Sequence, residues 1–92
     1  MKRRANIPEP TPHVIIRVSG KLFRGHLNYL DQLVDSATEC QLWPLLSLAQ
    51  LEELDRDALL YLMDGEKRRF EIVSCPHFVR NQMEDERHRA AA

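Results

Sequence analysis

The chain has few of the residues that build disulfide scaffolds, phosphate loops or membrane spans. Its 92 residues include two cysteines, three glycines and one tryptophan, and the formal net charge is −1. Two cysteines are too few for a disulfide framework, and isolated glycines do not form a phosphate-cradling loop. No apolar run follows the basic start as in a signal peptide, and none approaches the length of a membrane span. We therefore expect a cytoplasmic protein with no membrane insertion and, because the charge is near neutral, no nucleic-acid partner.

The histidines and cysteines lack the paired spacing of a metal site. Cys75 and His77 form the closest pair, and no second pair such as Cys-x-x-Cys accompanies them. Cys75 is expected at a helix N-terminus, where a thiol can have a lowered pKa, but no partner base is identifiable. Ser47 lacks a Gly-x-Ser-x-Gly elbow, and the acidic pair Glu52 and Glu53 is expected in a solvated loop. The sequence therefore predicts no catalytic residue, no metal, no cofactor and no enzyme.

Hydrophobic patterning predicts the order strand, helix, strand, helix, strand, helix. β-Branched residues predict a strand over 13–20, and an apolar stripe at three- and four-residue spacing predicts a helix over 26–39. An apolar run predicts a buried strand within 42–48 that begins after Pro44. Asp55 is expected to cap a helix that ends near residue 69. Residues 70–74 are expected to form a strand, and Pro76 is expected to open a last helix.

These elements predict an α/β fold with one small domain. Strands joined through helices are expected to lie parallel, in a three- to four-stranded sheet with helices packed on it. Three of the five prolines lie in residues 1–12, which predicts a flexible lead-in there. The domain is expected over 13–86, and the charged end at 87–92 is expected to fray.

Three stretches of the chain carry a family resemblance. They are Val-Ile-Ile-Arg-Val-Ser-Gly-Lys-Leu over 14–22, Leu-Ser-Leu-Ala-Gln-Leu-Glu-Glu-Leu-Asp-Arg-Asp-Ala-Leu over 46–59, and Phe-Glu-Ile-Val-Ser-Cys-Pro-His-Phe-Val over 70–79. Together they resemble the STAS domain, which is shared by anti-sigma factor antagonists and the cytoplasmic tails of sulfate transporters. The central stretch aligns without gaps to the family's strand-loop-helix. The resemblance implies a STAS-like fold and a bacterial signalling protein whose partner is a kinase-like anti-sigma factor.

The chain departs from the family at the phosphorylation position. In the alignment Asp55 falls on the family's loop Asp, and Arg56 falls on the Ser or Thr that accepts phosphate in the antagonists. An arginine has no hydroxyl, and it places a permanent cation where the family has a switchable anion. The helix-entry Gly of the family is replaced by Ala58, and the strand Asp by Ser47. The domain is therefore degenerate at this position, and no phosphorylation is expected there.

We interpret the chain as a protein–protein interaction module of the antagonist type, which binds without phosphorylation at Arg56. The alternative is a STAS-like accessory subunit of a membrane transport complex, and the family resemblance also leaves a homodimer open. Asp55 and Asp57 have a second interpretation, as a helix cap and a carboxylate that complements the helix dipole. The expected partner-binding residues lie on the loop and the following helix: Gln50, Glu53, Asp55, Arg56, Asp57 and Tyr61. The segment Phe23–His26 is a further candidate for the docking surface.

Overall fold

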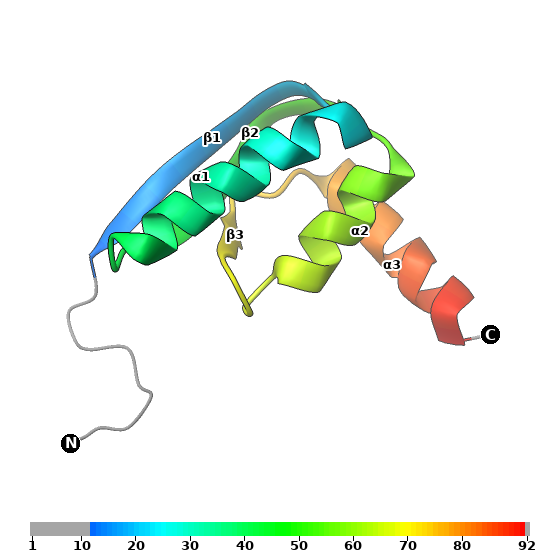
Figure 1. The fold of residues 1–92 in the computed structure, drawn as a ribbon. Coiled ribbons are helices and arrows are strands. Elements are labelled where there is room, and N and C mark those ends of the chain that lie inside the picture. Colours follow the sequence, from blue (N-terminus) through cyan, green and yellow to red (C-terminus); the bar gives the residue numbers. More distant parts are fainter. Residues whose placement is uncertain (1–11, 92) are drawn as a thin grey trace.

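The computed structural model describes residues 12–91, which form one three-stranded parallel sheet with helices packed on it (Figure 1). The strand order is β1-β2-β3, and a short 3-10 helix, η1, precedes the first α-helix. The small α/β fold is thus confirmed. The elements are β1 (His13–Leu22), η1 (Arg24–His26), α1 (Leu27–Glu39), β2 (Trp43–Leu54), α2 (Arg56–Gly65), β3 (Glu71–Val73) and α3 (His77–Ala91).

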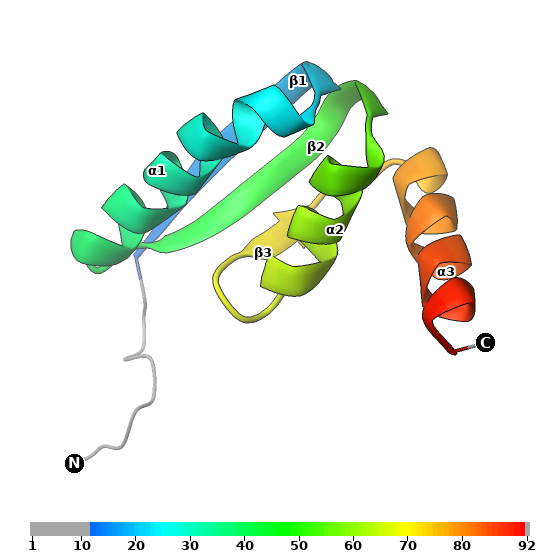
Figure 2. The ribbon, with the colours of Figure 1, turned by 45° about the vertical axis from the view of Figure 1, so that its right-hand side comes forward.

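The core lies between the sheet and the helices. Figures 1 and 2 both place α1 and α2 on the same face of the sheet, with α3 beside α2. Alternate residues of β1 point to this face, whereas Ile15 on the opposite face is 55% exposed. Fully buried side chains come from the sheet, from all three α-helices and from the segment before β3: Leu46 and Leu48 of β2, Val34 of α1, Leu62 of α2, Val79 and Met83 of α3, and Phe70. No helix in the described part of the chain is long and apolar enough to cross a bilayer.

The second strand is longer than the sequence predicts at both ends. It includes Pro44, although the strand was expected to begin after this residue. Trp43 donates its backbone N–H to the carbonyl of Pro12 at 2.9 Å, on the β1 side of β2. The backbone nitrogen and carbonyl of the next residue, Pro44, therefore point to the β3 side. Pairing with β3 begins only at Leu45, and Pro44 therefore leaves no ladder hydrogen bond unmade.

At its other end β2 continues through residues that were expected in a loop. Lys21 pairs with Glu53, and Leu22 pairs with Leu54, so the segment from Gln50 to Leu54 is strand. Register shifts between Arg17 and Ser19 and after Gly20 accommodate the extra residues of β2. Gly20 adopts a positive φ of 71° at the second shift, which a glycine tolerates without a Cβ penalty.

The second helix ends at Gly65 and not near residue 69. The carbonyl of Gly65 accepts N–H groups from Arg68, Arg69 and Phe70, so the chain turns toward β3 at once. Gly65 is buried against the ring of Phe70, and residues 67–69 lie in the turn. The last helix begins after Pro76 and continues to Ala91, so residues 87–91, which were expected to fray, are helical. The predicted lead-in falls on residues 1–12, of which 1–11 lie outside the described residues.

Candidate interaction surface

The junction between β2 and α2 is fixed by Asp55. Its carboxylate accepts the N–H of Ala58 at 2.9 Å, which confirms the predicted N-cap, and the N–H of Arg24 at 2.8 Å. The hydrogen bond from Arg24, followed by that from Ala58, lowers the pKa of Asp55. Asp55 therefore ties the start of α2 to the segment that follows β1.

Arg56 is held by a carboxylate of the last helix. Its Nη2 lies 2.7 Å from Glu86 Oε2, and its Nε lies 3.4 Å from Oε1. Glu86 is 8% exposed, whereas the side chain of Arg56 is 65% exposed. The hydrogen bond raises the pKa of Arg56 and lowers the pKa of Glu86. Arg56 is thus an oriented, permanently charged cation with an accessible surface.

The other charged residues around this junction form exposed pairs. Arg24 Nε lies 3.6 Å from Asp57, and Lys21 Nζ lies 4.0 Å from Glu53. Exposed pairs of this kind contribute little to stability, so these side chains remain available to a partner. We name the surface formed by Glu53, Asp55, Arg56 and Asp57 the α2 tip; Asp55 is half-buried and the other three are exposed. Gln50 is also exposed, but it lies earlier on β2, where it pairs with Ser19.

Tyr61 lies apart from the α2 tip, in the contact between α1 and α2. Its hydroxyl donates to Asp31 at 3.0 Å, and its ring stacks on Phe70 with centroids 5.8 Å apart. Arg69 also donates to Asp31, at 2.5 Å. Burial, with Asp31 as the second cause, raises the pKa of Tyr61 to about 12. The structure therefore brings four of the expected residues together at the start of α2. Gln50 lies earlier on β2, and Tyr61 has contacts within the fold.

The sequence interpretation did not include Glu86, the residue that orients Arg56. Val79, Met83 and Glu86 follow one another at four- and three-residue spacing, which places them on the buried face of α3. A carboxylate on an apolar stripe indicates a buried pair, and this spacing could have identified it. Arg24, whose backbone N–H donates to Asp55, lies in the segment Phe23–His26 that is a further candidate for the docking surface.

Histidine, cysteine, aspartate and glutamate, whose side chains can ligate a metal, occur along residues 12–91. No group of three His, Cys, Asp or Glu side chains that could hold a metal ion is found there. Cys75 is half-buried, and burial raises its pKa, whereas its place near the start of α3 led us to expect a lowered one. Desolvation thus outweighs the nearby Arg80, which acts in the opposite direction.

Comparison with known proteins identifies no relative. No family model matches the chain, and neither a curated protein nor a solved structure is significantly similar to it. The resemblance to STAS domains therefore remains a prediction from the sequence.

Proposed function

We propose that this chain is a cytoplasmic protein-binding module of the anti-sigma factor antagonist type, which docks through the α2 tip without phosphorylation at Arg56. The proposed partner is an anti-sigma factor or another kinase-like regulator. The observation that carries the proposal is the state of Arg56, whose guanidinium is held by Glu86 while most of its side chain is exposed.

An oriented guanidinium favours constant binding over switching. Holding a side chain in one geometry before association reduces the conformational entropy that binding costs. Arginine keeps its charge at every physiological pH, and it offers planar, directional donors to a carboxylate of a partner. The neighbouring Asp57 and Glu53 supply the opposite charge, so the tip has the mixed pattern that gives protein interfaces their specificity.

Site-specific photo-crosslinking from two positions of α2 tests this proposal. A photoreactive residue at Asp57 lies in the α2 tip, and the same residue at Asp64 lies near the other end of the helix; both side chains are exposed. We expect crosslinking in the host from position 57 to capture a regulatory protein, which mass spectrometry identifies. Arg56→Glu should abolish that product, whereas Arg68→Glu, an exposed charge reversal away from the tip, should not.

Several results would contradict the proposal. One is the same set of products from both positions, and another is an unchanged yield with Arg56→Glu. The third is capture of a permease or transport ATPase from position 57, which would favour the accessory subunit of a transport complex. Capture of a second copy alone would assign the tip to a homodimer.

A further inference from the structure

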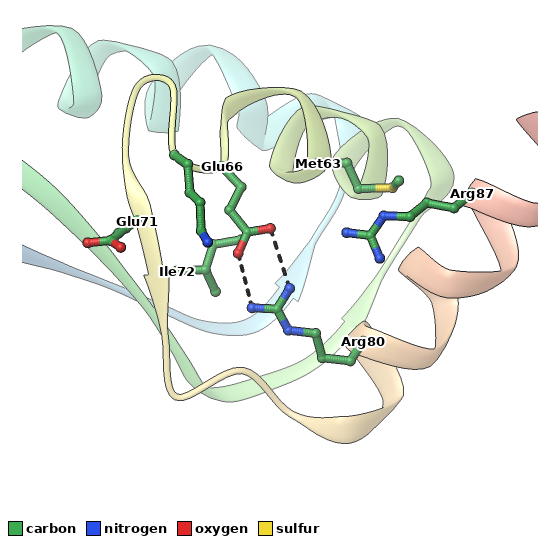
Figure 3. Close-up of a pocket in the computed structure, with 7 residues that line it drawn as sticks. Met63, Glu66, Glu71, Ile72, Arg80 and Arg87 are labelled. Carbon is green, nitrogen blue, oxygen red and sulfur yellow. Dashed lines mark hydrogen bonds and ion pairs between the residues drawn. The ribbon is translucent and has the colours of Figure 1, made fainter.

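A hollow of about 500 Å³ lies between the end of α2, β3 and α3, away from the α2 tip (Figure 3). The hollow exists because α2 ends at Gly65 and the chain turns into β3 while α3 runs alongside. Its volume is in the range of small-molecule sites, which is about 300–1,000 Å³. The side chains that matter for its chemistry are Met63, Glu66, Lys67, Ile72, Arg80 and Arg87. We name it the α2–α3 hollow.

The inner carboxylate of the hollow is already neutralised. Arg80 Nη2 lies 3.0 Å from Glu66 Oε2, and its Nη1 lies 3.4 Å from Oε1, so both oxygens accept hydrogen bonds (Figure 3). The side chain of Glu66 is 15% exposed and that of Arg80 is 42% exposed. The carboxylate of Glu71, which also borders the hollow, points away from this pair in Figure 3. Of the two carboxylates that border the hollow, Glu66 is therefore neutralised, and Glu71 is turned away from it.

Two further cations, Lys67 and Arg87, line the hollow, and neither is neutralised by a close carboxylate. No acidic side chain of residues 12–91 lies within ion-pair distance of Lys67. Arg87 extends from α3 toward Met63 in Figure 3, and its nearest carboxylate is the exposed Glu84 at 3.9 Å on its own helix. An exposed pair at this distance is weak. The hollow thus has two cations whose charge is available to a ligand.

The backbone at Lys67 is held in an unfavourable conformation. Its φ is 68°, which is in the left-handed region that a residue with a Cβ rarely adopts. Its N–H donates to the carbonyl of Phe70 at 2.6 Å, which closes the turn. A turn of this kind favours glycine or asparagine, so the presence of lysine here is consistent with a use for its charge.

We propose that the α2–α3 hollow binds a small organic phosphate. A phosphate monoester carries a charge of about −2 at neutral pH, which matches the two available cations Lys67 and Arg87. Arginine and lysine donate charge-assisted hydrogen bonds to phosphate oxygens. Met63 and Ile72 supply the apolar wall against which the organic part would pack. This site is separate from the α2 tip, and its existence does not depend on the function proposed for the tip.

A titration of the full chain with phenyl phosphate, followed by amide NMR, tests the proposal. We expect saturable shifts confined to residues 63–72 and 80–87. Lys67→Glu and Arg87→Glu should each weaken binding about tenfold, since each removes a charge-assisted contact. Lys67→Gln, which removes the charge without reversing it, should weaken binding less. The amide spectrum of each variant reports whether the fold is retained.

Two charge reversals outside the hollow are the matched controls. Arg68→Glu changes the residue next to Lys67, and the side chain of Arg68 pairs with Asp64 outside the hollow. Arg17→Glu changes an exposed residue of β1. Each should alter the affinity for phenyl phosphate by less than about twofold, because screening weakens distant charges. Equal weakening by Arg68→Glu and Lys67→Glu, or equal shifts with benzyl alcohol, would overturn the site. Tighter binding of a phosphotyrosine peptide than of phenyl phosphate would overturn the small-molecule assignment.

Discussion

An ion pair connects α3 to each end of α2, but the arginine comes from α2 in one pair and from α3 in the other. At the α2 tip Arg56 of α2 pairs with Glu86 of α3, and at the hollow Glu66, which follows α2, pairs with Arg80 of α3. In both pairs the carboxylate is the less exposed partner, with 10% and 15% of its side chain exposed. A nearly buried carboxylate requires its arginine, so each pair fixes the position of α3.

The surroundings of the two pairs differ. Glu86 has a second cation, Arg89, at 3.6 Å, whereas no second cation of the described residues lies within ion-pair distance of Glu66. At the α2 tip the exposed cations face carboxylates, and at the hollow Lys67 does not. The difference teaches that one end of the helix pair presents exposed charges of both signs close together, which the proposed protein-docking surface requires. The other end keeps the charge of Lys67 unneutralised, which the proposed phosphate site requires.

The largest loss of stability is expected from a substitution of Met83, the buried apolar residue between the two ion pairs. Met83 is fully buried and lies on α3 between Arg80 and Glu86. We expect Met83→Ala to lower the free energy of unfolding by about 3 kcal/mol, because a buried methionine leaves a cavity. Urea denaturation measures this change, and the exposed neighbour Gln82→Ala should change stability by less than about 0.5 kcal/mol. A loss smaller than that caused by Arg80→Ala would mean that the ion pairs, and not the core, hold α3.

A smaller loss is expected from filling the turn at the hollow end. A Cβ at Gly65 would lie 2.3 Å from Cε2 of the buried Phe70 ring. We expect Gly65→Ala to destabilise the protein by about 2 kcal/mol in urea denaturation, which is typical of overpacking. Gly25→Ala near the α2 tip is the matched control, since nothing lies within 4 Å of its Cβ position. Equal effects of the two substitutions would show that the ring of Phe70 moves aside without cost.

Local sequence signals predict the element order and the start of α2. The cap at Asp55 depends on contacts within a single turn, and the alternation of strands and helices depends on periodicity. Both are therefore readable without knowledge of tertiary structure. The end of α2 was missed because Gly65 and the cations that follow it are compatible with a helix. The turn is decided by packing of Gly65 against Phe70, a tertiary contact.

The extent of β2 and the partner of Arg56 could not be predicted from local signals. The acidic residues Glu52 and Glu53 are poor strand formers, and they are strand because β1 continues beside them to Leu22. Most of the expected site residues lie together at the α2 tip because they are close in the sequence. Glu86 joins Arg56 from 30 positions away, and only the packing of α3 on α2 brings the two into contact.

Removing the arginine should lower the free energy of unfolding by different amounts at the two ion pairs. Arg80→Ala leaves Glu66 without a cation among the described residues, whereas Arg56→Ala leaves Glu86 with Arg89. We expect Arg80→Ala to lower the free energy of unfolding by about 1 kcal/mol, a value limited by the solvent exposure of the pair. Arg56→Ala should have a smaller effect in the same urea experiment. A larger loss with Arg56→Ala would show that Arg89 does not compensate, and a double-mutant cycle with Arg89→Ala would measure that coupling.

The smallest effect is expected in acid, at the α2 tip. Arg56 lowers the pKa of Glu86 below its ordinary value of 4.5, so the folded state binds that proton less readily than the unfolded chain does. The resulting stabilisation is complete above the unfolded pKa, and it is lost as the pH falls through the lower folded pKa. We therefore expect the stability difference between wild type and Glu86→Gln to shrink as the pH is lowered from neutral to about 3 in urea denaturation. The shrinkage should be smaller in the Arg56→Ala background, because Arg56 is the main cause of the lowered pKa. A difference that stays constant with pH would mean that Glu86 stabilises the α2 tip by packing and not by its charge.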